Sequence, residues 1–350
     1  MAITIERART NQPQQILILS EDSSLRAHIE AIATSLGAFV HISDPESMDL
    51  VAVGYFIAIV EHKNLKQEHL ETFLKFAKES DTDAPVILLS DEPYPAVPPL
   101  FQLRHSQTNL LNRLIEKHFR QASTNAALHA LYCEWLGVIQ PTLHNLKRKH
   151  PDLSDPFALY VYPDFFDSFS KLMLFGKQTN GWGPDKAFAT GFWPSDLLET
   201  YRRFKFALAG YNLSPFWDFS HKLHNALNPG VGKFGFIWNN ILKIDNGGEK
   251  PPGVVAQLSW DPFPVIQKEL DVLKPDIVVF ATGPTYDDFI TQVFPDCNIV
   301  PMKANQRIAR IESPNLPQLS FRIDHPKYLR LTRTFDKRLD QIIHLLHQPP

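Results

Sequence analysis

The chain has 350 residues and a formal net charge of −3, with 44% hydrophobic and 21% charged residues. This length favours two domains of ordinary size, and the near-neutral balance gives no general attraction to a polyanion. With only two cysteines a disulfide framework is not expected, and a reducing, cytoplasmic setting fits best.

Charge and hydropathy vary along the chain. No apolar run resembles a signal peptide or a membrane span, so no membrane association is expected. Residues 1–122 hold 11 Lys/Arg against 16 Asp/Glu, whereas residues 301–338 hold 9 against 3. The basic C-terminal segment is compatible with contact to DNA phosphates and equally with docking of one domain on the other.

Apolar strands and helical patterns alternate over residues 14–122. The predicted strands are 15–20, 38–42, 55–60, 84–89 and 100–104, and the predicted helices are 23–36, 66–79 and 108–120. Five strands alternating with helices predict a doubly wound α/β domain of flavodoxin-like order. The small polar residues 121–127 mark the expected boundary with a second domain at 128–347, which begins with a helix over 128–139.

Polar residues follow the strands of this first domain, namely Glu21, Asp22, Glu61, Ser90 and Arg104. Their order resembles that of response-regulator receiver domains, which keep an acidic pair after the first strand and a phosphoacceptor Asp after the third. Glu61 stands at the phosphoacceptor place, and its longer side chain would misplace the carboxylate relative to Mg²⁺. The resemblance therefore implies a pseudo-receiver, which binds a protein partner, self-associates or regulates. The alternative is that any small α/β sheet ends its strands in polar residues.

The second domain repeatedly ends an apolar run in polar residues. The run at 172–175 leads to Gly176, Gln178 and Asn180, the run at 234–238 leads to Asn239, and that at 319–324 leads to His325. Buried parallel strands deliver polar loops to sites at their carboxyl ends in this way. Ordinary strand–loop junctions and an Asn-capped turn are the alternatives.

Aromatic and basic residues accompany these strand ends. Phe192 and Trp193 are either core residues or a surface on which a base stacks. Lys327, Arg330 and Arg333 follow His325 and are placed to meet phosphates.

In order and context, residues 130–345 resemble the uracil-DNA glycosylase superfamily. The loop GKQTNGW from Gly176 is similar to that family's first loop, which puts Gln178 and Asn180 at the place that positions water. The resemblance implies that Phe192, or else Trp193, stacks on a flipped base and that Asn239 reads its edge.

The motif DHPKYL extends the resemblance. It implies that His325 stabilises charge on the departing base and that the basic residues after it grip the DNA backbone. This chain departs from the family at Gln178, a neutral residue where some branches have Asp, and at Thr179, which replaces Pro. After the His-Pro pair, Lys327 and Tyr328 replace the small residues that are usual in the family's minor-groove loop.

The expected fold class is therefore α/β, with two three-layer α/β/α domains, a receiver-type sheet followed by a uracil-DNA-glycosylase-like sheet. The expected function is a DNA glycosylase of repair or phage defence, whose partner is DNA with an extruded base. The alternatives are a non-catalytic nucleic-acid or nucleotide sensor with the same fold, and an unrelated hydrolase-like or nucleotide-binding domain. No cofactor or metal is expected, because metal signatures are absent and two cysteines cannot hold a four-cysteine iron–sulfur cluster.

Overall fold

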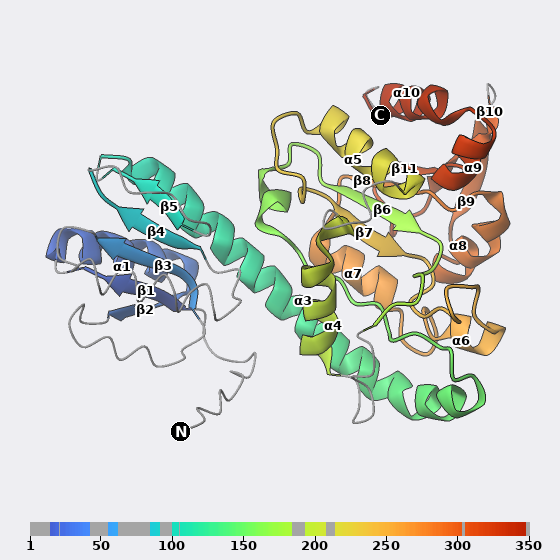
Figure 1. Cartoon of the computed structure of the whole chain (residues 1–350), viewed down its shortest axis with the longest axis horizontal. Coiled ribbons are helices and arrows are strands. Elements are labelled where there is room, and N and C mark those ends of the chain that lie inside the picture. The colour runs from blue at the N-terminus through green and yellow to red at the C-terminus, as the bar shows by residue number, and fades with distance from the viewer. Residues whose placement is uncertain are drawn as a thin grey trace. The chain divides into compact units, whose positions relative to one another are not determined.

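The computed structural model describes residues 15–20, 22–42, 55–61, 85–91, 100–104, 106–183, 193–207, 214–302 and 305–347. The chain divides into two compact units, residues 1–126 and 127–350. Each unit contains its own β-sheet with helices (Figure 1), which confirms two α/β domains.

The sheet of the first unit is entirely parallel, with strand order β2-β1-β3-β4-β5. This flavodoxin-like order agrees with the sequence prediction. The side chains from Ile57 to Val60 in β3 are fully buried, as expected for a strand covered on both faces. The strands are β1 (Gln15–Leu19), β2 (Phe39–Ile42), β3 (Tyr55–Glu61), β4 (Val86–Leu89) and β5 (Leu100–Leu103).

Helix α1 (Ser23–Leu36) lies where the sequence predicts a helix. Asp22 caps its first turn, and Gly37 ends it with a φ of 72°. This left-handed conformation suits glycine, which has no β-carbon to clash. The predicted helix at 66–79 lies outside the described residues.

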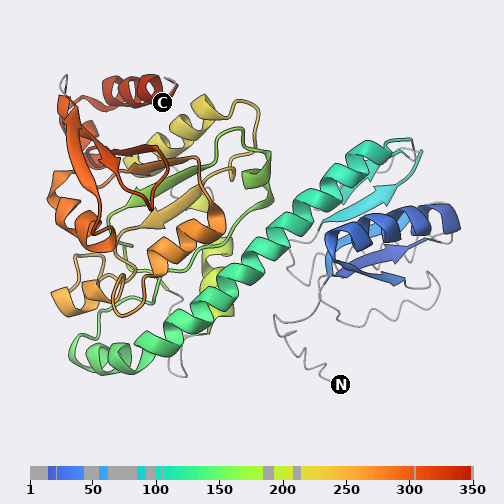
Figure 2. The same cartoon turned by 180° about the vertical axis from the view of Figure 1, so that it is seen from behind.

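Helix α3 (Thr108–Lys149) is one continuous helix of 42 residues. The prediction of two helices separated by residues 121–127 is wrong, because that segment contains no glycine or proline to stop a helix. Figures 1 and 2 show α3 as a single unbroken ribbon. Its first part gives Leu111 and Ile115 to the core of the first unit, and its second part gives Leu128 and Leu143 to that of the second.

The sheet of the second unit has the order β7-β6-β8-β11-β10-β9. The first four of these strands are mutually parallel, and β10 pairs antiparallel with both β11 and β9. The antiparallel edge was not predicted from the sequence. The strands are β6 (Leu172–Gly176), β7 (Ile237–Asn240), β8 (Ile277–Phe280), β9 (Asn298–Met302), β10 (Asn305–Glu312) and β11 (Leu319–Arg322).

Helices cover both faces of this second sheet. Tyr201 of α4 and Trp217 of α5 contact Trp238 on one face, whereas Glu269 of α7 meets Asn239 on the other. The helices are α4 (Pro194–Phe204), α5 (Pro215–Leu227), α6 (Gly253–Gln257), α7 (Val265–Leu273), α8 (Asp287–Val293), α9 (Pro326–Leu331) and α10 (Phe335–Leu346). Short 3-10 helices are η2 (Pro163–Asp167), η4 (Lys205–Ala207) and η5 (Pro284–Tyr286).

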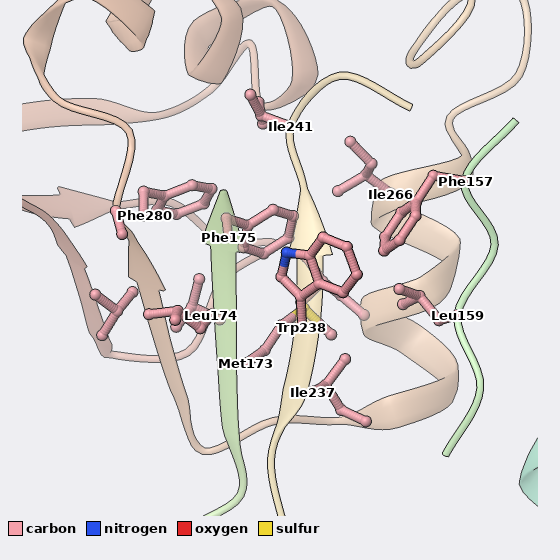
Figure 3. Packing of buried hydrophobic residues seen from close by; sticks show 14 of the residues in the cluster. Phe157, Leu159, Met173, Leu174, Phe175, Ile237, Trp238, Ile241, Ile266 and Phe280 are labelled. Atoms are coloured by element: carbon pink, nitrogen blue, oxygen red, sulfur yellow. The ribbon is translucent and has the colours of Figure 1, made fainter. Parts of the chain in front are cut away.

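The core of the second unit is rich in aromatic side chains (Figure 3). Trp238 packs edge-on against Phe157 with ring centroids 4.6 Å apart, and Phe175 stacks on Phe280 at 4.7 Å. Such pairs add to the stabilisation from buried area, so they anchor the strands just before their carboxyl ends. Among the described residues, no helix has both the length and the apolar character needed to cross a bilayer.

Candidate functional site

The chain passes from β6 to β7 toward one edge of the sheet and from β8 to β9 toward the other edge, so the direction reverses between the neighbouring strands β6 and β8. In open α/β sheets, ligands bind outside the carboxyl ends of strands at such a switch point. We use the name strand-end site for the residues that gather there, namely Gly176, Lys177, Gln178, Phe216, Asn240, Tyr286 and His325.

Gly176 and Asn240 are paired in register at the ends of β6 and β7. A β-carbon on Gly176 would lie less than 3.0 Å from the side-chain oxygen of Asn240, so this place requires glycine. Asn240 is buried, yet its Nδ2 has no hydrogen-bond partner among the described residues. A buried donor without a partner is costly and is typical of a place where a ligand or water completes the bonding.

The neighbouring Asn239 points to the opposite face of the sheet, because successive residues of a strand alternate. Its Nδ2 donates to Glu269 at 2.9 Å, and its Oδ1 accepts from Lys243 Nζ at 2.7 Å. The sequence prediction placed Asn239 against a base, but the structure commits both of its polar ends to internal partners. The amide that belongs to the strand-end site is that of Asn240.

Asn239 is part of a fully buried ionic network. Lys243 Nζ donates to both carboxylate oxygens of Glu269 at 2.7 and 2.8 Å, and Tyr132 OH donates to Glu269 at 2.7 Å. Burial lowers the pKa of Lys243, while Glu269 opposes this effect. Because Asn239 Oδ1 also accepts from the backbone N of Asn240 at 2.8 Å, the network fixes the strand end that carries the free amide.

His325 forms the N-cap of α9, and its Nδ1 accepts from the backbone N of Lys327 at 3.2 Å. Burial, helped by the charges of Lys177 and Lys327, lowers the pKa of His325 to about 4. The ring is therefore neutral at pH 7. Since Nδ1 accepts, the single ring proton belongs on Nε2, which makes Nε2 a donor.

The aromatic side chain of the site is Phe216 on α5. Its ring is stacked with that of His325 at a centroid distance of 6.0 Å, and it would lie 3.5 Å from a β-carbon on Gly176. Phe216 was not predicted from the sequence, although Pro215 signals the start of this helix. Of the two predicted stacking residues, Phe192 lies outside the described residues and Trp193 is 61% exposed before α4.

Gln178 bridges two loops. Its Oε1 accepts from Tyr286 OH at 2.5 Å, and its Nε2 donates to the carbonyl of Gly248 at 3.2 Å. Burial raises the pKa of Tyr286 to about 12, so this hydroxyl keeps its proton. Asn180 is exposed, and a β-carbon on Gly248 would lie 2.5 Å from its Oδ1. The predicted role of these two amides in positioning water stays a prediction.

The loop after β6 is held by Asp245, which the sequence analysis missed. Its buried carboxylate accepts from Thr179 Oγ1, from the backbone N of Gly181 at 3.2 Å and from that of Gly248 at 2.6 Å. The Asp-Asn-Gly-Gly sequence at 245–248 is a turn signal that could have pointed to it.

Asp155 lies beneath the same loop, where its backbone N donates to the carbonyl of Trp182 at 3.0 Å. Lys147 Nζ of α3 donates to its carboxylate at 2.7 Å. Burial nevertheless raises the pKa of Asp155 to about 6, with Lys147 opposing the shift and Asp245 adding to it. This carboxyl group therefore titrates well above the range of an exposed aspartate.

Unpartnered polar atoms lie at the carboxyl ends of several parallel strands of the second unit. Besides Asn240 Nδ2 after β7, these are Thr282 Oγ1 after β8 and Asp324 Oδ2 after β11, all buried and without a hydrogen-bond partner among the described residues. The other oxygen of Asp324 accepts from Arg307 at 2.8 Å. Three parallel strands, β7, β8 and β11, thus present unmet hydrogen-bonding capacity at their carboxyl ends.

The basic residues after His325 differ in their surroundings. Lys327 and Arg333 are exposed, whereas Arg330 pairs with Asp218 of α5 and lies 3.8 Å from the ring centroid of Phe335. The predicted backbone contacts are thus open to Lys327 and Arg333, while Arg330 has internal partners. At the end of α9, Leu331 is 76% exposed.

In the first unit, the receiver-like residues have local partners. Asp22 Oδ1 accepts from the backbone N of Ser24 at 2.8 Å, and the buried Glu61 accepts from Ser20 Oγ at 2.5 Å. Ser90 is buried, Arg104 is exposed, and Glu21 lies outside the described residues. Within the described part of the chain, no group of three potential metal ligands occurs.

No known family model matches this chain, and no curated protein matches it either.

Proposed function

We propose that the second unit is a DNA N-glycosylase that takes an extruded base into the strand-end site. The observation that carries this proposal is the unpartnered amide of buried Asn240, which lies at a switch point together with the neutral His325. A base flipped from the duplex is read through hydrogen bonds to its edge and through contact with aromatic rings.

Each residue has a distinct part in the proposed reaction. Asn240 donates to the base edge, and Phe216 forms an aromatic wall beside it. His325 donates from Nε2 to the oxygen on which negative charge develops as the N-glycosidic bond breaks. Preorganised donors of this kind stabilise a developing anion without needing to reorient.

Gln178 takes no proton in this scheme. The transition state at the sugar is cation-like, so stabilising the leaving base contributes more than deprotonating water. The missing general base lowers the rate by about 10²–10⁴-fold relative to an enzyme that has one.

DNA would approach over α9. Lys327 and Arg333 are exposed cations for phosphate contact, and such contacts make binding depend on salt. Leu331 is an exposed apolar side chain beside them, and apolar wedges of this kind separate stacked bases when a protein kinks DNA. The first unit, with Asp22 and Glu61 committed to local hydrogen bonds, would serve as an interaction or regulatory module without phosphotransfer.

The test is incubation of the full chain with single- and double-stranded DNA carrying uracil or one of a panel of modified bases, followed by assay of abasic sites. Asn240→Ala and His325→Ala should each lower base release by about 10²–10³-fold, as loss of one preorganised donor does. Asn298→Ala and His347→Ala, at exposed positions, are the matched controls. Absence of abasic product from every DNA would refute the proposal.

A second function is favoured by Gln178. Its amide is neutral and bonded to protein at both ends, which suits a site that recognises a base without cleaving it. A non-catalytic nucleic-acid sensor would bind DNA in a salt-dependent manner, lose that binding in Asn240→Ala and release no base.

A further inference from the structure

Lys177 is a cation that the proposed reaction does not use. It directly follows Gly176, and its carbonyl accepts from the backbone N of Leu242 at 3.0 Å, which ties it to the end of the sheet. Its Nζ lies 5.1 Å from the ring centroid of Tyr286, the residue that hydrogen-bonds to Gln178. The half-buried amine is therefore held within the strand-end site.

No carboxylate among the described residues pairs with Lys177. Two other lysines of this unit do have such a partner, since Lys147 pairs with Asp155 and the fully buried Lys243 with Glu269. Burial alone lowers the pKa of Lys177, and its charge contributes to the lowered pKa of His325. An unpaired, partly desolvated lysine has a larger fraction of uncharged amine. The uncharged amine is the form that attacks carbonyl carbons.

We propose that Lys177 forms an imine with the C1′ aldehyde of an abasic deoxyribose. This inference rests on the proposed function for the source of the aldehyde, because base release leaves an abasic sugar whose ring opens to an aldehyde. The ligand class is thus an aldehydic sugar within DNA.

The step balances without an oxidant or a reductant. The neutral amine of Lys177 attacks C1′ and forms a C–N bond, the two amine hydrogens pass to the carbonyl oxygen, and that oxygen leaves as water. Addition of water reverses the step and restores the free lysine. The imine would hold the reactive product in place until hydrolysis releases it.

The experiment uses the full chain and duplex DNA that contains one preformed abasic site, in the presence of sodium borohydride. Reduction converts an imine into a stable amine, so a protein–DNA adduct should appear on a denaturing gel and map to Lys177 by peptide mass spectrometry. Lys177→Arg keeps the charge but cannot form the imine under these conditions, and it should abolish the adduct, as should Lys177→Met. Lys149→Met, which removes an exposed lysine at the end of α3, is the matched control and should retain it.

Absence of the adduct, its mapping to another amine, or its persistence in Lys177→Met would overturn the inference. Tryptophan fluorescence of each variant checks that the second unit is folded, because all six tryptophans lie within it. Adduct formation by a protein that releases no base would refute the proposed function and leave the imine standing. Base release without an adduct would refute the imine and leave the proposed function standing.

Discussion

The polar groups at the carboxyl ends of the parallel strands differ between the two sheets of this protein. In the first unit, the polar groups after β1 and β3 satisfy one another, as Ser20 donates to Glu61 and Asp22 caps α1. In the second unit, Asn240, Thr282 and Asp324 each keep a buried polar atom without a partner in the described part of the chain. Polar residues at strand ends therefore do not by themselves indicate a site, whereas unmet hydrogen-bonding capacity does.

The same contrast recurs within β7, between adjacent asparagines. Asn239 is bonded to Lys243 and Glu269, and Asn240 offers a free amide. Asn239, which is bonded within the protein, should contribute to the free energy of unfolding, whereas Asn240, with its free amide, should contribute to ligand binding. The following substitutions test this division.

The largest expected effect on stability comes from Glu269→Gln. It leaves the charge of Lys243 buried and uncompensated, which should lower the free energy of unfolding by about 3–5 kcal/mol. Urea denaturation followed by tryptophan fluorescence reports this unit alone, and Glu249→Gln at an exposed position is the control. A loss below about 1 kcal/mol would show that the network is not the support inferred above.

Ser20→Ala and Asn240→Ala compare a strand end whose polar groups are hydrogen-bonded with one whose amide has no partner. The first removes a donor to the buried Glu61 carboxylate and should destabilise the first unit by about 1–3 kcal/mol. The second removes an amide whose Nδ2 has no partner, and it should change the unfolding free energy of the second unit by less than about 1 kcal/mol. Hydrogen exchange of β1 and β3 measures the former and tryptophan fluorescence the latter. Equal losses would contradict the comparison.

Asp22→Ala should have a smaller effect. The substitution removes the N-cap of α1 and should cost about 1 kcal/mol. Faster hydrogen exchange confined to the first turn of α1 is the expected result. Asp22→Asn keeps an acceptor at the same place and should retain most of the stability that Asp22→Ala loses. If Asp22 instead served a receiver-type acidic site, its negative charge would be needed and Asn could not replace it.

The smallest net effect is expected in the pH dependence of stability. The pKa of His325 falls from 6.5 to about 4 on folding, so the unfolded chain binds more protons and stability drops as pH falls through this window. The pKa of Asp155 rises from 3.8 to about 6, so its contribution has the opposite sign and grows as pH falls below 6.

These two contributions partly cancel between pH 4 and 6. Asp155→Asn removes one of them, so the variant should lose stability more steeply on acidification than the unsubstituted protein. Urea midpoints measured by tryptophan fluorescence at several pH values test this, and an unchanged slope would contradict the assignment.

Much of the fold could be predicted from the sequence because the signals are local. Buried strands such as Ile57–Val60 read as continuous apolar runs, and α1 carries both its cap at Asp22 and its stop at Gly37. The antiparallel strands β9 and β10 were missed because Pro301 and the charged side chains of β10 interrupt any apolar pattern.

The candidate site was predicted less well, for geometric reasons. A shift of one residue in a strand exchanges the two faces of a sheet, and the sequence offered no means to choose between Asn239 and Asn240. Phe216 and Asp245 reach the strand ends only through the tertiary arrangement of α5 and of the loop after β7. The strand that delivers Gly176 was correctly located, because its apolar run ends at a glycine.

The continuity of α3 has a consequence for dissecting this protein. Proteases cut where the backbone is exposed and irregular, and residues 121–127 belong to a helix. Limited digestion should therefore spare this junction. Shortened versions of the chain that start at residue 127 would sever a helix in its middle, so fragments are better begun at its first residue, Thr108.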